Sequence, residues 1–360
     1  MFGNNPFDGA FGLDIGDLSL KLVQLSAAKK QKGQITYKIK NSRQIALPIG
    51  YIVNGEIQQP EMVRKKLLQL LDKIGYGKKI TSPWVVADLP EPKTFLTSVE
   101  FDIPASQITK EDIEFQCQKH LPFDISNAYI DWQIAPQAED QKTTRVLIGA
   151  VEKIAADSYT YLLQSANLQP IALEVEALAI ARVLIDQDRS GSGAILDLGA
   201  TRSAIIIYDK GGVRFSTSLN FSGELINTAL AQNLKMDYHK IEEMKIKNGL
   251  NYIKEFPNYL KIIDELTQEL VAQIKKAFDY YQNHYPNTQP IEKMVICGGM
   301  AEMENLLDTL ARRLEIPCEF ANCYQNIVTK NLPAEYKKTA LTMISAIGLA
   351  MRATINPYND

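Results

Sequence analysis

Two distant copies of one short pattern constrain the fold of this chain more than any other feature. The first copy covers residues 11–16 and is followed by the apolar segment 20–25, and the second covers residues 194–199 and is followed by 203–208. Each has an apolar strand, an Asp, one apolar residue, a Gly, a short polar turn and a second apolar strand. This pattern predicts a β-hairpin. Because the copies are so far apart, they indicate two related lobes rather than a short-period solenoid.

Composition narrows the class of protein. A length of 360 residues predicts two or three domains, and 46% hydrophobic residues with a net charge of −3 are typical of an ordinary globular protein. Without a bulk positive charge, we expect no nucleic-acid partner. The four cysteines form no CxxC pair, and the three histidines offer little material for a catalytic triad. No signal peptide or membrane span is recognisable, so we expect a cytoplasmic protein with no direct membrane insertion.

The Gly/Ser-rich turn at residues 190–193 is the best candidate for a hinge between the two lobes. Before this turn, a strand at 95–101, a helix capped by Thr109 and Asp112 and a strand at 129–134 indicate a small inserted subdomain. Further elements are expected as helices at residues 155–166, 175–185, 224–235, 238–247, 259–281, 303–314 and 339–351. We therefore predict lobe 1 at residues 1–190 and lobe 2 at residues 191–360.

The two Asp-x-Gly turns favour binding of a phosphate ligand. A Gly after a strand lets backbone N–H groups approach a phosphate closely, as Gly16 and Gly199 would do. Asp14 and Asp197 can each hold Mg²⁺, through water, because this ion gives up its hydration shell reluctantly. Two such turns facing each other would clamp a triphosphate from both sides. For either copy alone, a plain hairpin turn explains the same residues.

A third element strengthens the nucleotide hypothesis. A strand at 293–297 leads into Gly298, Gly299 and Met300 before a helix, which suits close packing against a flat purine or a sugar. In the first hairpin, Ser19 and Lys21 could add a hydroxyl and a positive charge. The order of the three elements is that of actin-like nucleotide-binding proteins. Together they predict ATP and Mg²⁺ as ligands.

With these motifs, the chain resembles the PilM family of type IV pilus assembly proteins, which is related to the division protein FtsA. The resemblance runs nearly end to end, through residues 12–16, 20–23, 118–123, 157–163, 173–177, 196–201, 241–245 and 346–352. The helix end Leu121-Pro122-Phe123 and the segment Val175-Glu176-Ala177 discriminate best, because generic actin-like proteins lack them.

The resemblance implies an α/β fold, namely the two-lobed actin-like (ribonuclease H-like) ATPase fold with an inserted 1C-type subdomain. Lobe 1 would be subdomain 1A, with subdomain 1C inserted at about residues 92–143. Lobe 2 would be subdomain 2A, with subdomain 2B inserted at about residues 219–286.

The resemblance also implies the residues of a nucleotide site. The first hairpin would bind phosphate through Asp14, Gly16, Asp17, Ser19 and Lys21, and the second through Asp197, Gly199, Ala200, Thr201 and Arg202. The adenosine pocket would be lined by Glu242, Lys245, Gly298, Gly299 and Met300.

Several positions depart from the family pattern. Asp17 stands where Ser or Thr is common, and Arg202 stands in a turn that is usually rich in Thr. For hydrolysis, Glu176 or Glu174 could orient the attacking water, whereas a favourable helix-start charge explains an acidic residue at this place equally well. At most a slow ATPase is expected.

The implied function is an ATP-binding cytoplasmic scaffold of the type IV pilus, or of a related secretion machine. Its implied partners are the N-terminal tail of a PilN-like inner-membrane protein, which would recruit it to the inner face of the membrane, and other pilus-assembly components. Homo-oligomer formation stays open. The alternatives are a sugar or acid kinase of the same fold and an FtsA-like cell-division protein.

Overall fold

The computed structural model describes residues 5–31, 34–72, 75–135, 143–185, 191–285, 287–329, 332, 336 and 339–356. The chain folds into two units. Unit 1 comprises Met1–Ile185 and Asn322–Asp360, and unit 2 comprises Asp186–Ala321. The predicted boundary after residue 190 therefore lies close to the observed one. The predicted second lobe extended to residue 360, and this is corrected, because the chain returns to unit 1 at residue 322.

A six-stranded sheet forms the core of unit 1, in the order β10 (Gln169–Val175), β6 (Trp84–Leu89), β1 (Phe11–Ile15), β2 (Ser19–Gln31), β3 (Gln34–Ala46) and β16 (Ile327–Val328). β1 runs antiparallel to β2, as the first hairpin pattern predicts. It runs parallel to β6, which in turn runs parallel to β10. The carboxyl ends of these three parallel strands therefore lie along one edge of the sheet.

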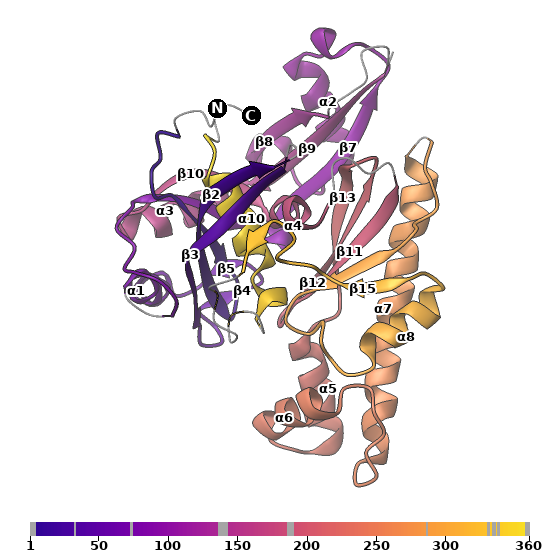
Figure 1. Ribbon diagram of the computed structural model, residues 1–360. Coiled ribbons are helices and arrows are strands. Elements are labelled where there is room, and N and C mark those ends of the chain that lie inside the picture. The colour runs from indigo at the N-terminus through magenta and orange to yellow at the C-terminus, as the bar shows by residue number, and fades with distance from the viewer. Residues whose placement is uncertain are drawn as a thin grey trace. The chain divides into compact units, whose positions relative to one another are not determined.

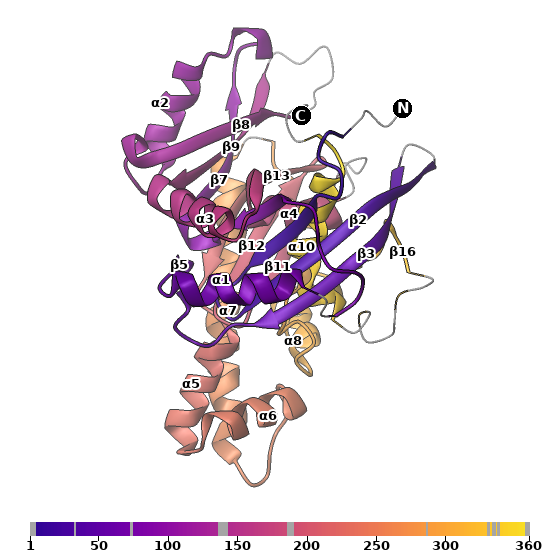
Figure 2. The same cartoon turned by 90° about the vertical axis from the view of Figure 1, so that its left-hand side faces the viewer.

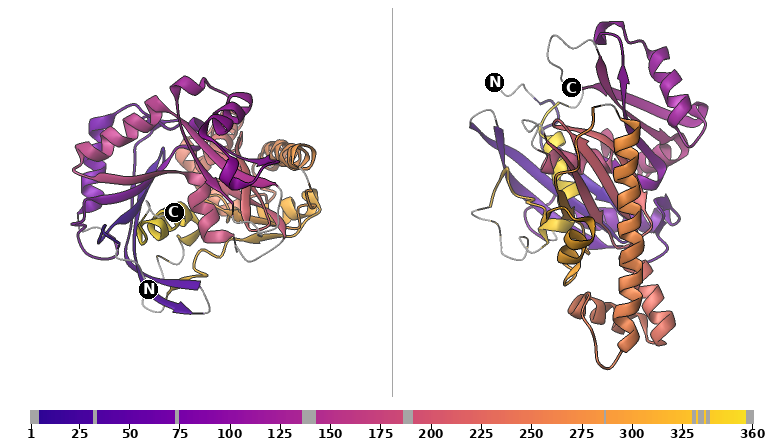
Figure 3. Two further views of the ribbon diagram at one scale, coloured as in Figure 1. Left: turned by 90° about the horizontal axis from the view of Figure 1, so that it is seen from above. Right: turned by 90° about the vertical axis from the view of Figure 1, so that its right-hand side faces the viewer.

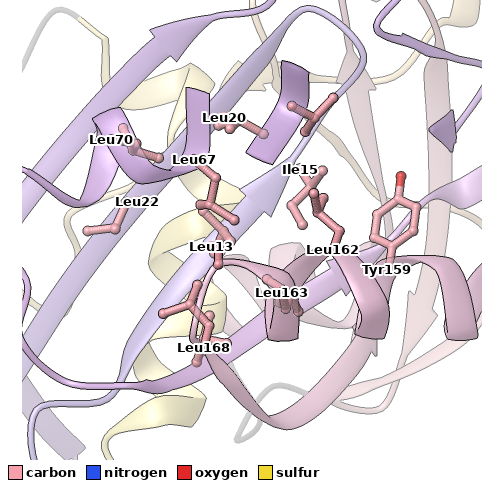
Figure 4. Packing of buried hydrophobic residues seen from close by; sticks show 14 of the residues in the cluster. Leu13, Ile15, Leu20, Leu22, Leu67, Leu70, Tyr159, Leu162, Leu163 and Leu168 are labelled. Carbon is pink, nitrogen blue, oxygen red and sulfur yellow. The ribbon is translucent and has the colours of Figure 1, made fainter. Parts of the chain in front are cut away.

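Helices cover both faces of this sheet. α1 (Pro60–Leu71) and α3 (Lys153–Ser165) pack on one face, where Leu67, Leu70 and Leu163 join the apolar side chains of β1 and β2 (Figures 2 and 4). On the other face, α4 (Glu176–Leu184) and α10 (Ile344–Ala353) pack against β1 and β6. Both layers exclude water from the strands, which accounts for the near-continuous apolar sequence of β1 and β6.

The closing helix α10 explains why residues 322–360 belong to unit 1. Nine of its ten residues are buried, and it lies directly against α4. An ideal Cβ at Gly348 would stand 1.9 Å from the carbonyl oxygen of Ala179, so only glycine permits this approach of the two helices. Such a contact links residues far apart in sequence, which is why periodicity alone placed this helix in the wrong lobe.

A smaller part of unit 1 corresponds to the predicted insertion. It contains the antiparallel strands β7 (Thr94–Phe101), β9 (Thr144–Glu152) and β8 (Ala128–Ile134), with β9 between the other two. α2 (Lys110–His120) packs on this sheet through Ile113 and Cys117. Thr109 and Asp112 form the predicted capping box at its start. The short elements of unit 1 are β4 (Ile52–Val53), β5 (Glu56–Ile57), η1 (Glu91–Lys93), η2 (Ala105–Gln107), η3 (Ile125–Asn127) and η4 (Ala340–Thr342).

Unit 2 contains a second sheet, with neighbouring strands in the order β15 (Cys318–Phe320), β14 (Met294–Cys297), β11 (Ser192–Leu198), β12 (Ser203–Asp209) and β13 (Gly212–Leu219). β11 and β12 form the second predicted hairpin. The long helix α7 (Pro257–His284) packs against β12, β13 and α8 (Leu306–Leu314), and its first half also contacts α5 (Gly223–Leu234), which packs on α6 (Tyr238–Asn248) (Figures 1 and 3). Among the described helices, none combines the length and apolar character needed to cross a membrane.

A buried carboxylate connects three elements of unit 1. Glu174, at the end of β10, is 3% exposed and accepts hydrogen bonds from Arg182 of α4 and Arg352 of α10, the latter at 2.9 Å. Arg182 also donates to the carbonyl of Gly348 at 3.1 Å. Burial by itself would raise the pKa of Glu174, but the two guanidinium groups outweigh it and hold the pKa below its usual range. The pair of arginines thus secures α10 to the sheet.

We predict that Glu174→Gln destabilises the protein by about 2 kcal/mol, because it leaves Arg182 and Arg352 without their carboxylate partner. The loss should shrink as the pH falls, since the lowered pKa of Glu174 stabilises the wild type only while this group is ionised. Urea unfolding at neutral and acidic pH measures both effects. As a control, Glu61→Gln, which removes a surface pair with Arg64, should cost no more than about 0.5 kcal/mol. Equal losses in the two variants would contradict the prediction.

Candidate nucleotide-binding site

The first Asp-x-Gly hairpin adopts the predicted form. The amide of Gly16 donates to the carbonyl of Ser19 at 3.0 Å and closes the turn. Asp14 and Lys21 are direct register partners on β1 and β2, and the Lys21 ammonium lies 2.8 Å from a carboxylate oxygen of Asp14. Asp14 is only 2% exposed. Lys21 therefore supplies the counter-charge of a carboxylate that water hardly reaches.

Three carboxylates meet where the parallel strands of unit 1 end. Asp14 lies near the end of β1, Asp88 near the end of β6, and Glu176 directly after β10. One oxygen from each lies within 4.8 Å of the others. Hard oxygen donors of this kind are the ligands that Mg²⁺ prefers, so the three side chains fit a divalent cation, directly or through water. We call this group the carboxylate cluster.

Asp88 is the most perturbed member of the cluster. Burial raises its pKa well above the usual range, and the negative charges of Asp14 and Glu176 raise it further. The amide of Ile15 donates to Asp88 at 2.9 Å and, with Lys21, opposes this effect without cancelling it. Asp88 therefore keeps its proton at pH values at which an exposed aspartate has lost it.

The two candidate catalytic glutamates have different surroundings. Glu176 belongs to the carboxylate cluster and accepts a hydrogen bond from the Ser345 hydroxyl of α10 at 3.0 Å. Glu174 lies on the same segment, but Arg182 and Arg352 bind both of its oxygens. Of these two glutamates, Glu176 is therefore the one whose position suits contact with a ligand at this edge.

Asp17, a predicted phosphate contact, is buried and has a protein partner. One of its carboxylate oxygens accepts a hydrogen bond from the amide of Gly55 at 3.1 Å. This bond ties the turn of the first hairpin to the β4–β5 loop. Ser19, by contrast, is half-buried at the start of β2. The acidic residue at position 17 thus has a structural partner that explains its departure from the family pattern.

In unit 2, the second hairpin has the same form and a tighter turn. An ideal Cβ at Gly199 would lie 2.3 Å from the carbonyl oxygen of Arg202, so the turn requires glycine at this position. Thr201 and Arg202 occupy the turn and are half-buried, and Ala200 is exposed. Asp197 is half-buried, and one of its oxygens accepts a weak hydrogen bond from the Cys297 thiol at 3.7 Å.

Two of the predicted adenosine residues, Lys245 and Met300, lie at the start of α5. An ideal Cβ at Gly223 would lie 3.1 Å from both the Lys245 Nζ atom and the Met300 Sδ atom, and 3.4 Å from the carbonyl oxygen of Ala200. Lys245 is 7% exposed and donates to the carbonyl of Gly223 at 3.3 Å. Burial lowers its pKa, while nearby Glu242 opposes this shift. The structure therefore gathers residues from both predicted motifs of unit 2.

The hairpin and the glycine loop of unit 2 are held in place by backbone bonds. The amide of Met300 donates to Leu198 O at 3.0 Å, so the loop with Gly298 and Gly299 lies beside the hairpin. The amides of Gly223 and Glu224 donate to the hairpin carbonyls Gly199 O and Ala200 O, at 3.3 and 2.8 Å. The start of α5 thus supports the second hairpin.

Sequence reasoning missed two of these residues. Asp88 ends an apolar run at residues 84–87, the same signal as Asp14 at the end of β1, and this signal could have identified it. Ser222 caps α5 by accepting from Leu225 N at 3.1 Å, and a Ser before a helical pattern is a standard start signal. This start signal would have identified Gly223 as the first residue of α5.

A family model described as "Type IV pilus assembly protein PilM" matches residues 12–354. The chain belongs to the PilM family. No curated protein matches the sequence. A solved structure titled "PilM-PilN type IV pilus biogenesis complex" is similar over 97% of this chain and 99% of that chain, with a TM-score of 0.79 and 20% sequence identity.

Two other solved structures share the fold with this PilM-family chain. The ethanolamine utilization protein EutJ from Carboxydothermus hydrogenoformans has a TM-score of 0.55 and 12% identity, covering 95% of this chain and 88% of that chain. MreB 5 of Spiroplasma citri bound to AMPPNP has a TM-score of 0.54 and 11% identity, covering 97% of each chain. The predicted actin-like ATPase fold is confirmed.

We predict that Asp88→Asn stabilises the protein at about pH 8, by about 1 kcal/mol, because it removes a buried acid that ionises unfavourably. An acid with a raised pKa costs the folded state stability as the pH rises through that pKa. The gain should therefore disappear below about pH 3, where the aspartate is protonated in the folded and in the unfolded chain. Urea unfolding over this range tests the expectation. A gain that does not depend on pH would contradict it.

Proposed function

We propose that this PilM-family protein is an ATP-binding scaffold of the type IV pilus inner-membrane assembly complex and that it binds the N-terminal tail of a PilN-like protein. The observation that carries the nucleotide part is the carboxylate cluster beside the first hairpin, since it offers a divalent cation its preferred ligands next to a turn suited to phosphate. Family membership supports the pilus part over the kinase and division alternatives.

In the proposal, the first hairpin binds the phosphates and their metal ion. Lys21 would exchange its contact with Asp14 for a phosphate oxygen once Mg²⁺ neutralises the carboxylate. Asp14 and Glu176 would hold the Mg²⁺ ion or its waters. Since Glu176 is fixed by Ser345 of α10, it is also our candidate for orienting a water molecule. Mg²⁺ would supply charge neutralisation, and hydrolysis would be slow at most.

The second hairpin and the Lys245 region would bind the rest of the nucleotide. Lys245 is a buried amine that donates a hydrogen bond to a neutral carbonyl, that of Gly223. A phosphate oxygen or a ribose hydroxyl is a suitable further acceptor for this group. Asp197 is our further candidate for holding a metal-bound water. The glycines at 298 and 299 would leave room for the base or the sugar.

The small sheet of unit 1 offers a place for the PilN-like tail. β8 pairs with β9 on one side, and no other described strand pairs with it. Its side chains Trp132 and Ile134 are 36% and 41% exposed. An extended apolar tail could add a strand at this edge and cover both side chains. A membrane-anchored partner would then hold this cytoplasmic protein at the inner face of the membrane.

We predict that Asp14→Ala and Asp197→Ala each weaken Mg-ATP binding by at least about ten-fold, which corresponds to about 1.4 kcal/mol. Each variant removes a carboxylate that we assign to the metal and its waters. Isothermal titration calorimetry with Mg-ATP measures the change. Asp279→Ala, an exposed position on α7, is the matched control. If both variants bind Mg-ATP as tightly as the control, the nucleotide assignment is refuted.

We also predict that Trp132→Ala weakens binding of a synthetic peptide from the tail of the cognate PilN-like protein by about ten-fold, as expected for an aromatic anchor. Tyr161→Ala, an exposed aromatic change on α3, should leave it unchanged. Fluorescence anisotropy of the labelled peptide, with and without Mg-ATP, measures both. Tight binding to the Trp132 variant would exclude β8 as the docking edge.

A further inference from the structure

Unit 2 contains a cavity that lies apart from the residues assigned to the nucleotide. It has a volume of about 500 Å³ and lies between the start of α7, α8 and the segment that joins α6 to α7. Figure 1 shows α8 beside the long helix α7, and contacts between the two helices agree with this view. The lining of the cavity includes Leu250, Tyr252, Leu260, Lys261, Asp264 and Arg312.

The walls of this cavity are held by hydrogen bonds. The amide of Leu250 donates to the carbonyl of Glu304 at 2.9 Å, and the Asn305 amide group donates to Asn251 at 2.7 Å. From α7, the hydroxyl of Tyr259 donates to the carbonyl of Gly249 at 2.9 Å. The connecting segment is therefore fastened to both helices. A ligand would meet a site that is already formed, which lowers the entropic cost of binding.

Apolar side chains line one part of the cavity. Leu250 is buried and Leu260 is half-buried. Tyr252 stands at the rim and is 63% exposed. A large aromatic side chain that remains exposed beside a cavity is typical of an anchor for a partner's apolar side chain. The volume is in the range of cavities that accommodate one or two such side chains.

The charge at the rim is positive. The carboxylate of Asp264 already has partners within the protein. It forms an ion pair with Arg313 and accepts a hydrogen bond from the side-chain amide of Gln268 at 2.8 Å. Arg312 has no ion-pair partner among the residues that the structure describes. Lys261 forms a long ion pair with Glu265, at 3.9 Å, and both side chains are largely exposed. Two cations thus flank the apolar part of the cavity, and the lining carboxylate of Asp264 is already paired with Arg313.

We propose that this cavity binds a short acidic segment of a partner protein, which inserts an apolar side chain beside Tyr252 and Leu260 and places carboxylates on Lys261 and Arg312. The positive rim selects acidic chains and the cavity selects those with an apolar anchor. This site goes beyond the proposed nucleotide and PilN-like functions, since Lys245, Met300 and β8 take no part in it. It would give the protein a second docking surface, on unit 2.

The test uses the full-length protein and two pools of short fluorescein-labelled peptides. Both pools carry Leu and Phe at the same places, and the remaining positions are Asp and Glu in the first pool and Lys and Arg in the second. The acidic pool should bind and the basic pool should not, as measured by fluorescence anisotropy. Affinity for the acidic pool should fall as salt is added, because the contacts at the rim are exposed to solvent.

The double variant Lys261→Glu, Arg312→Glu should weaken binding of the acidic pool by about ten-fold or more. The matched control is Lys275→Glu, an exposed charge reversal further along the same helix α7, which should bind like the wild type. Tyr252→Ala should also weaken binding, without changing its salt dependence. Retained Mg-ATP binding in every variant would confirm that the protein is folded.

Two results would overturn the proposal. One is absence of binding of the acidic pool, or binding equal to that of the basic pool. The other is an affinity of the double variant that matches the Lys275→Glu control. Neither result bears on the nucleotide assignment, which is measured separately on Asp14 and Asp197.

Discussion

Unit 1 depends on keeping three carboxylates together at the end of one sheet. Asp14, Asp88 and Glu176 would repel one another if nothing compensated their charges. The compensation comes from different elements: Lys21 on β2, the backbone amide after Asp14, and a hydroxyl on α10. The hairpin, the parallel strands and the closing helix must therefore all be in place before the cluster is tolerated, and a metal ion bound there would stabilise all three at once.

Unit 2 uses a different solution for a similar hairpin. In unit 1 the Asp of the hairpin pairs with a lysine on the neighbouring strand, whereas the lysine of unit 2, Lys245, comes from the separate helix α6. It donates to the carbonyl of Gly223 at the start of α5, where a Cβ at Gly223 would stand 3.1 Å from its Nζ atom. The internal repeat therefore extends to the backbone of the two hairpins but not to their charges.

Local patterns predicted much of the fold, and they failed where the structure depends on distant partners. Both hairpins and the capping box of α2 follow from residues close in sequence, and they were found. The strand β10 was missed, because residues 169–175 become a strand only by pairing with β6. Asp88 was missed for the same reason, since its role requires β6 to lie beside β1. The wrong assignment of α10 arose from its contact with α4, which no periodicity reveals.

The path of the chain has a consequence for synthesis on the ribosome. Unit 1 is interrupted after residue 185 and resumes at residue 322, so the whole of unit 2 is made before α10 exists. Until then, β1 and β6 lack the packing of α10, and Glu174 has Arg182 but not yet Arg352 as a partner. Closing this long loop late makes completion of unit 1 slower than that of unit 2, whose chain is continuous. Nascent unit 1 is thus the part that most needs protection from aggregation while the chain is being made.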